Sequence, residues 1–422
     1  MSEFKFLIRF GVHKDREAIR SLRGSISGMV IPAHILCYST NATIAAISYI
    51  QKDYYIDPMT YLYADQNIKE YVVLNTETKR NSFKPSIAKL TESYGLTALF
   101  DGRGFSPLIP EDFTDEFIAT FCQKNIDLQT NKIDTDKAGA YKKYSDLLKK
   151  VGENHVVEEM ETAHTPAAII PPYFFIGNVE SVWVGINLRL AQKTKELLVG
   201  TELPVMPVIL TDASTLKAEL LSFYTDFKDL FLWMDDFGQK QTISVPQEAE
   251  YKNAANFIRS ASAQNFKIID LRGTYFSVLL GKLGLKGLCN GVFYGETKAR
   301  MSSVGGVPPV RYYLRKLHEF YGIAEATQLL KKYPELLDKD CSKCMSLING
   351  SVDDIFHLNS QPQLAQAHFV YSREAEIEDM ENNDLAILSK ELSDTFDKYA
   401  RLPSSITTKN VDYLRIWKDS IN

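Results

Sequence analysis

The chain has 422 residues, of which 45% are apolar and 24% are charged, which is ordinary usage for a globular protein. Its net charge of −5 provides no overall positive field for nucleic acid, although a local basic patch remains compatible with this value. Five cysteines do not make a disulfide framework at this length, and no stretch reaches the roughly 18 apolar residues of a membrane span. The N-terminal residues lack the pattern of a cleavable signal, so we expect a soluble, cytoplasmic protein.

Eight short apolar runs predict β-strands, and most are continuous rather than alternating, as in parallel strands buried on both faces. They are Phe4–Phe10, Met29–Leu36, Leu96–Asp101, Ala167–Phe175, Pro204–Thr211, Asp229–Asp236, Phe266–Leu271 and Leu285–Phe293. Eight strands alternating with helix-compatible stretches over about 290 residues predict an α/β fold of the (β/α)₈ barrel type. An open doubly wound sheet is the alternative, but no Gly-x-Gly-x-x-Gly fingerprint follows an early strand.

Three segments depart from this alternation. Residues 38–95 are irregular, and the segments Tyr54–Tyr63 and Tyr71–Leu74 within them are either extra strands or an insertion. Residues 111–161 are charged and hold no strand candidate, which predicts a helical insertion after the third strand. The alternation stops near residue 300, so we expect a barrel over residues 1–300 and a helical C-terminal annex, packed on it, over residues 301–422.

Carboxylates follow several of the predicted strands. In a barrel, the chemistry lies at the carboxyl ends of the strands and in the loops after them. A single Asp at such a place is readily explained as a helix N-cap or a turn residue, but several at one opening repel one another and are costly without a use. Crowded carboxylates also push their pKa values apart, which suits acid–base chemistry. The candidate catalytic residues are Asp101, Asp235, Asp236, Asp270 and Glu296, and Asp212 lies at a further strand end.

Glycine, arginine and tyrosine residues accompany these carboxylates and are candidates for substrate binding. They are Arg103, Gly104, Arg272, Gly273, Tyr275, Tyr294, Arg311 and Tyr312. A glycine after a strand permits either a tight turn or a close approach of the backbone to a ligand. The arginine and tyrosines near residue 311 either cover the opening or pack the annex onto the barrel.

The segment Cys341-Ser342-Lys343-Cys344 has the spacing with which two thiolates bind one tetrahedral Zn²⁺. His368 is the candidate third ligand, and His357, Asp338 and Asp340 are further candidates. Two ordinary cysteines, or a redox pair, remain alternatives, although no thioredoxin-like unit surrounds the motif.

Three segments together resemble the tRNA-guanine transglycosylase superfamily, including its branch that inserts 7-deazaguanines into DNA. Residues 100–105 (Phe-Asp-Gly-Arg-Gly-Phe) are similar to the family's Asp-Ser-Gly-Gly-Phe segment, and residues 270–275 to its penultimate strand and Gly-rich loop. Cys341 and Cys344 with His368 are similar to the end of its zinc motif, whose first cysteine falls here at Lys339. The family's nucleophilic Asp falls near Cys289-Asn290, where this sequence has no carboxylate.

The resemblance implies an enzyme that exchanges a purine base for a 7-deazapurine in DNA or tRNA. A carboxylate nucleophile would hold the sugar at C1′ while a second carboxylate moves a proton at the purine. It implies Asp101 as the base, with Glu296 or the pair Asp235-Asp236 replacing the nucleophile, and a structural zinc at Cys341, Cys344 and His368. Its partners would be the nucleic acid, a free modified purine base, and a second copy or a partner protein.

The sequence is also compatible with two other functions. The first is a metal-dependent barrel hydrolase or lyase that acts on a small molecule, with Asp235, Asp236, Asp270 and Glu296 around a divalent ion. The second is a catalytically inactive barrel that serves as a nucleic-acid recognition subunit, for which the missing nucleophilic Asp is the main support.

Overall fold

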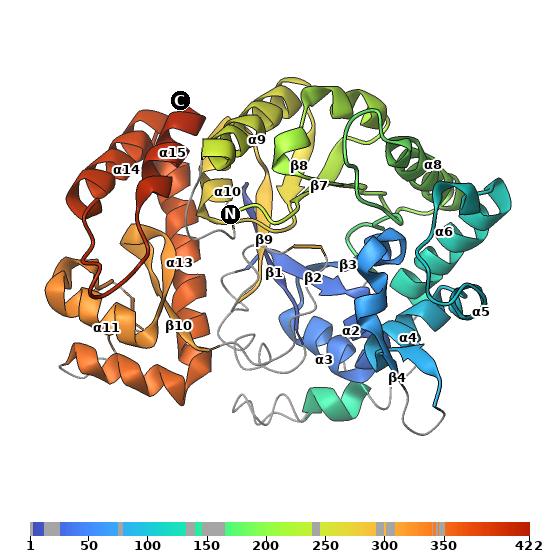
Figure 1. Ribbon diagram of the computed structural model, residues 1–422, viewed down its shortest axis with the longest axis horizontal. Coiled ribbons are helices and arrows are strands. Elements are labelled where there is room, and N and C mark those ends of the chain that lie inside the picture. The colour runs from blue at the N-terminus through green and yellow to red at the C-terminus, as the bar shows by residue number, and fades with distance from the viewer. Residues whose placement is uncertain are drawn as a thin grey trace.

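A computed structural model describes residues 3–11, 26–74, 79–131, 140–145, 165–238, 245–292, 299–300, 309–339, 341–342, 345 and 351–422. Its centre is a sheet of seven parallel strands in the order β3-β2-β1-β9-β8-β7-β6. The strands are β1 (Lys5–Arg9), β2 (Gly28–Pro32), β3 (Asp53–Asp57), β6 (Val208–Thr211), β7 (Asp229–Met234), β8 (Lys267–Asp270) and β9 (Gly287–Asn290). The sheet curls into a half-barrel (Figure 1). Because its strands are all parallel, their carboxyl ends lie along the same edge of the sheet.

The α/β class is confirmed, but the predicted closed (β/α)₈ barrel is wrong, because the sheet is open between β3 and β6. The predicted strand Ala167–Phe175 lies at this opening, and among the described residues it makes one isolated bridge, from Ile169 to Val205. It contains Pro171-Pro172, whose nitrogens carry no hydrogen and cannot donate to a strand ladder. The run is therefore apolar enough for a strand but cannot complete the hydrogen bonding of a closed sheet.

The third strand of the sheet is β3, whereas the predicted strand Leu96–Asp101 is wrong and is occupied by helix α5 (Thr97–Gly102). Leu96 and Phe100 are buried and lie four residues apart, which is the spacing of one helical face. In β3, by contrast, the consecutive residues Tyr54, Tyr55 and Ile56 are all buried, as in a strand covered on both faces.

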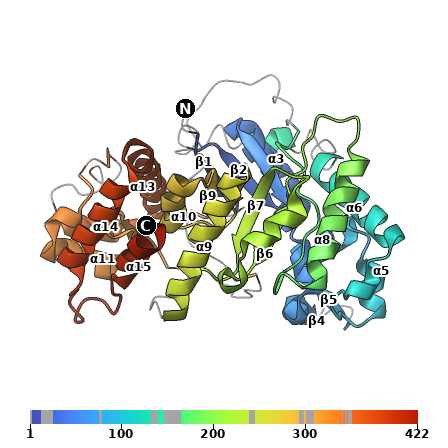
Figure 2. The same ribbon diagram turned by 90° about the horizontal axis from the view of Figure 1, so that it is seen from above.

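Helices cover the outside of the half-barrel and continue into two flanking groups (Figures 1 and 2). Around and beside the sheet lie α2 (Ala33–Tyr38), α3 (Thr40–Ile50), α8 (Val182–Leu197), α9 (Val245–Ala263) and α10 (Tyr275–Leu280). On one flank, the hairpin of β4 (Val72–Leu74) and β5 (Asn81–Phe83) accompanies α4 (Pro85–Ser93), α5 and α6 (Asp115–Thr130). The predicted strand Met29–Leu36 is divided between β2 and α2.

The opposite flank is the C-terminal part of the chain. It holds the hairpin of β10 (Arg311–Leu314) and β11 (Glu319–Gly322), then α11 (Ile323–Lys332), α13 (Pro362–Asn382), α14 (Leu385–Tyr399) and α15 (Asp412–Ile421). Trp417 of α15 packs against Tyr251 of α9 and Tyr275 of α10, which joins this part to the half-barrel. None of the helices within the described residues has the length and apolar character needed to cross a membrane.

Candidate functional site

A buried ion pair joins the ends of β1 and β3. Asp57 ends β3, is fully buried, and accepts a hydrogen bond from Nη2 of Arg9, the last residue of β1, at 2.8 Å. The hydroxyl of Tyr173 donates to the other oxygen of Asp57 at 2.8 Å, and the backbone N–H of Met59 donates to that oxygen at 3.0 Å. Tyr173 directly follows Pro171-Pro172, so the segment at the open edge of the sheet contributes to this group.

A second arginine approaches from β8. Arg272 is 5% exposed and its guanidinium lies 4.9 Å from the ring centroid of Trp233 on β7. Its Nε and Nη2 have no hydrogen-bond partner among the described residues. The thiol of Cys289 on β9 interacts electrostatically with both arginines and with Asp57 and Asp270, so these side chains belong to one group. We call it the carboxyl-end site; its members are Arg9, Asp57, Tyr173, Asp270, Arg272 and Cys289.

The two carboxylates of the carboxyl-end site have opposite pKa shifts. Burial alone would raise the pKa of Asp57, but the charges of Arg9 and Arg272 outweigh it and hold that pKa below its ordinary value. Burial raises the pKa of Asp270 to about 6, against the hydrogen bonds that it accepts from Ser277 Oγ at 2.6 Å and from the Arg272 N–H at 3.0 Å. Asp57 is therefore held ionised, while Asp270 exchanges a proton near neutral pH.

The neighbouring groups keep their protons or their charges. Burial raises the pKa of the Cys289 thiol to about 12, so it is a neutral thiol rather than a nucleophile. Burial lowers the pKa of Arg272 to about 10, which leaves the guanidinium charged at neutral pH.

Further carboxylates lie at the ends of β6 and β7. Asp235 follows β7 and bonds to the backbone N–H and the guanidinium of Arg300, whose Nε also bonds to Asp65 at 2.8 Å. Burial raises the pKa values of Asp212 and Asp235, although Arg300 opposes the shift in both cases. Asp236 is exposed, in a left-handed turn with φ of 52°, and β7 has already ended at Met234.

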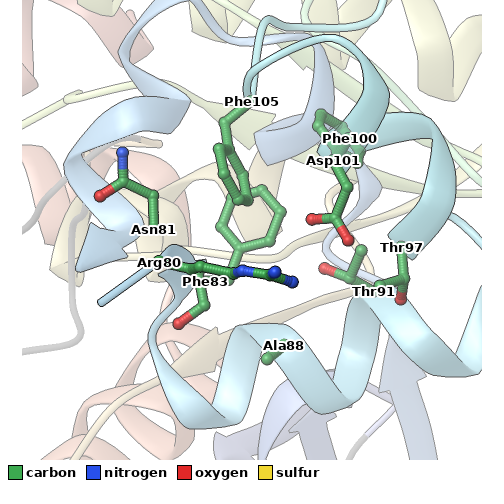
Figure 3. A pocket seen from close by; sticks show the side chains of 10 residues that line it. Arg80, Asn81, Phe83, Ala88, Thr91, Thr97, Phe100, Asp101 and Phe105 are labelled. Atoms are coloured by element: carbon green, nitrogen blue, oxygen red, sulfur yellow. The ribbon is translucent and has the colours of Figure 1, made fainter. Parts of the chain in front are cut away.

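Asp101 lies elsewhere, in a half-open cavity of about 530 Å³ on the flank of the molecule. The Phe83 ring packs against Phe100 and against Phe105 there, and the side chains of Arg80 and Asp101 extend into the cavity from opposite walls (Figure 3). We call it the α4–α5 pocket; it is lined by Arg80, Asn81, Ser82, Phe83, Ala88, Thr91, Thr97, Phe100, Asp101 and Phe105. The carboxylate that ends the third strand is thus Asp57, and Asp101 shares no cavity lining with the carboxyl-end site.

The predicted substrate-binding residues are dispersed. Arg103 forms an ion pair of 2.7 Å with Asp112, and Gly104 adopts a left-handed φ of 60° in a turn with open space around it. Gly273 does lie beside the carboxyl ends of the strands, in the segment that follows β8. A Cβ at this position would come within 2.7 Å of Leu288 Cβ, so the lack of a side chain lets this segment approach β9.

Two of the tyrosines predicted to bind substrate pack against residues of the C-terminal part of the chain. Tyr275 stacks on His318 with ring centroids 3.4 Å apart, and Tyr312 stacks on His368 at 4.5 Å. The guanidinium of Arg311 lies 4.6 Å from the Phe320 ring centroid. Tyr294 and Glu296 fall outside the described residues.

The candidate zinc ligands that the structure describes face one another. Cys341 Sγ lies 3.4 Å from Nδ1 of His368, and Nε2 of His368 bonds to the carbonyl oxygen of Tyr313 at 2.7 Å. Because a carbonyl only accepts, Nε2 carries the proton and Nδ1 presents its lone pair to the cysteine, as in histidines that bind zinc.

The rest of a zinc site is not brought together within the described part of the chain. Cys344 and Asp340 lie outside it, the candidate ligand Asp338 is paired with Arg315 at 3.1 Å, and His357 is exposed. No three His, Cys, Asp or Glu side chains among the described residues form a group that would hold a metal.

The sequence prediction missed Arg9, Asp57 and Tyr173, although Arg9 and Asp57 each had a signal. Arg9 is a basic residue inside the otherwise apolar end of Phe4–Phe10, where a charge is costly unless it is paired. Asp57 follows three apolar residues and precedes a proline, which is the same pattern of a strand end that selected the other carboxylates.

The chain matches no protein-family model, and no curated protein is significantly similar to it in sequence. The function therefore has to be argued from the residues themselves.

Proposed function

We propose that this protein is a transglycosylase-like enzyme that exchanges a purine base in DNA or tRNA, and that the reaction takes place at the carboxyl-end site. The observation that carries the proposal is the pair Asp57 and Asp270, two buried carboxylates in one group whose pKa values shift in opposite directions. Glycosyl transfer needs one carboxylate that stays ionised beside the sugar and another that gives and takes a proton.

In this proposal a carboxylate oxygen of Asp57 forms a bond to C1′ of the nucleotide as the bond from C1′ to the purine nitrogen breaks. The incoming base then bonds to C1′ and releases the Asp57 carboxylate. Asp270 donates the proton to the leaving purine and takes one from the incoming base. Asp57 thus replaces Asp101 as the functional carboxylate after the third strand. Arg9 and Tyr173 position Asp57, because they bond to its two oxygens at 2.8 Å each.

The metal-dependent alternative has less support. It requires Asp235, Asp236 and Asp270 around one ion, but Asp235 is bonded to Arg300 and Asp270 to Ser277, while Asp236 is exposed in a turn. The buried Asp270, with its raised pKa, favours the enzyme over the non-enzymatic alternative, because perturbed carboxylates cluster at functional sites.

The decisive experiment incubates the full chain with DNA or tRNA and a labelled free purine or 7-deazapurine, and measures label in the polymer and covalent adducts that survive denaturation. We expect exchange that falls at least about 100-fold in Asp57→Asn and in Asp270→Asn, the usual loss for an acid–base group. Asp101→Asn is the matched control and should retain activity. No exchange on either nucleic acid, or loss only in Asp101→Asn, would overturn the proposal.

We further propose that Cys341, Cys344 and His368 bind a structural Zn²⁺ in the C-terminal part. The support is the lone pair of His368 Nδ1 facing Cys341 Sγ at 3.4 Å, a separation that two ligands of one tetrahedral zinc have. Metal analysis should find about one zinc per chain, lost in Cys341→Ser. A metal-free protein with an unchanged melting temperature after chelation contradicts this site.

A further inference from the structure

The carboxyl-end site contains two arginines with buried guanidinium nitrogens that lack hydrogen-bond partners among the described residues. Arg9 is paired with Asp57 through Nη2, but its Nη1 is buried without a hydrogen-bond partner among the described residues. Arg272 has two such atoms, Nε and Nη2, and forms no ion pair with any carboxylate in the described part of the chain. A guanidinium buried in this way is costly unless a ligand satisfies it.

The two arginines come from strands that meet at the middle of the sheet. Leu7 and Ile8 of β1 pair with Cys289 and Asn290 of β9, which places Arg9 beside the end of β9. Gly273, next to Arg272, donates its N–H to the Cys289 carbonyl at 3.1 Å. Both guanidinium groups interact electrostatically with Cys289 and Asp57, so they lie near the same two side chains.

Asn290 sets a second requirement for any ligand that binds between the arginines. Its side-chain nitrogen donates to the Gly273 carbonyl, which fixes the orientation of the amide, and its Oδ1 is buried without a hydrogen-bond donor among the described residues. A group that satisfies all these atoms combines an anion for the arginines with a hydroxyl or N–H for Asn290.

We propose that Arg9 and Arg272 together bind one phosphate group of the substrate, which carries a sugar hydroxyl or an N–H close to that phosphate. This rests on the proposed function in that it names how the same site holds its nucleotide, but binding is measurable without turnover. The fork of N–H groups on each guanidinium matches the oxygens of a phosphate. Two other arginines are already paired with carboxylates, Arg300 with Asp65 and Asp235, and Arg315 with Asp338.

The test measures the melting temperature of the full chain against inorganic phosphate, a purine nucleoside 5′-monophosphate, and an oligonucleotide without a terminal phosphate, all at constant ionic strength. A ligand that binds the native state raises the melting temperature with its concentration. We expect inorganic phosphate and the monophosphate to do so in the wild type, and their apparent affinities to fall at least tenfold in Arg272→Met. The oligonucleotide arm separates a phosphodiester within nucleic acid from the phosphate of a free nucleotide.

Two variants keep this test decisive. Arg272→Met removes a buried charge that has no ion-pair partner among the described residues, so without phosphate it should melt at or above the wild-type temperature, whereas loss of a purely structural arginine would lower it. Arg189→Met is the matched control, because Arg189 is exposed and pairs with Asp115 on the surface, and it should respond to phosphate as the wild type does. The proposal is overturned if neither phosphate nor the monophosphate raises the melting temperature, or if Arg272→Met responds like the wild type. This result leaves base exchange to be decided by its own assay.

Discussion

The carboxyl-end site and the α4–α5 pocket both hold an arginine and a carboxylate, but they differ in burial and in how the chain builds them. Asp57 and Arg9 come from strands β3 and β1 and are bonded to each other, with the Asp57 side chain fully buried and the Arg9 side chain only 10% exposed. Asp101 and Arg80 come from one flank, are exposed, and face a cavity floored by phenylalanine rings. Charge held in the first region has a large energetic effect, whereas charge in the second is screened by solvent.

The largest difference should follow from neutralising one carboxylate in each region. Asp57→Asn leaves the Arg9 guanidinium buried without its counter-charge, and we expect the free energy of unfolding to fall by about 3–5 kcal/mol. Asp101→Asn should change it by no more than about 0.5 kcal/mol, as is usual for exposed positions. Urea unfolding of both variants measures this contrast, and similar values for the two would remove the distinction between the regions.

The buried carboxylate Asp270 of the carboxyl-end site should make the stability of the protein depend on pH. The pKa of Asp270 is about 6 in the native state and about 4 in an unfolded chain, so the native state binds the proton more tightly. Its contribution to stability is therefore full below about pH 4, declines as the pH rises, and is lost above about pH 6. As the pH rises from 4 to 7, the free energy of unfolding of Asp270→Asn should increase by up to about 3 kcal/mol relative to that of the wild type.

A variant of its partner checks the assignment to Asp270. Ser277 donates a hydrogen bond that favours the ionised carboxylate, so Ser277→Ala should move the decline in stability to higher pH. Unfolding curves measured from pH 4 to pH 8 report the shift. An unchanged profile in Asp270→Asn would show that another group causes the dependence.

Much of the half-barrel was predictable because a strand buried on both faces leaves a plain apolar run in the sequence. The runs at Phe4–Phe10, Pro204–Thr211, Asp229–Asp236, Phe266–Leu271 and Leu285–Phe293 correspond to β1, β6, β7, β8 and β9. The same pattern correctly predicts that Asp235, Asp270, Arg272 and Gly273 lie at or just after the carboxyl ends of strands. Their electrostatic environment was not predictable, since the partners of each side chain come from distant strands.

The prediction failed where a short apolar run suits two structures. Leu96–Asp101 has the composition of a strand, and only the i, i+4 placement of Leu96 and Phe100 identifies a helix. With the third strand predicted at this run, the carboxylate at its end is predicted to be Asp101 instead of Asp57. The family resemblance around Asp101 supports the same wrong prediction. One error in a strand thus moved the expected catalytic carboxylate to the flank of the molecule.

The smallest contrast concerns a glycine in each region. In Gly273→Ala the new Cβ would meet Leu288 Cβ at 2.7 Å and the Ser277 side chain at 3.0 Å, so the end of β8 must move away from β9. We expect a loss of about 1–3 kcal/mol, as for overpacking, together with weaker phosphate binding because Arg272 moves with its neighbour. Gly104→Ala meets no neighbour within 4 Å and incurs only the left-handed strain of about 1 kcal/mol, with phosphate binding unchanged. Equal phosphate binding in the two variants would mean that the approach of β8 to β9 does not position Arg272.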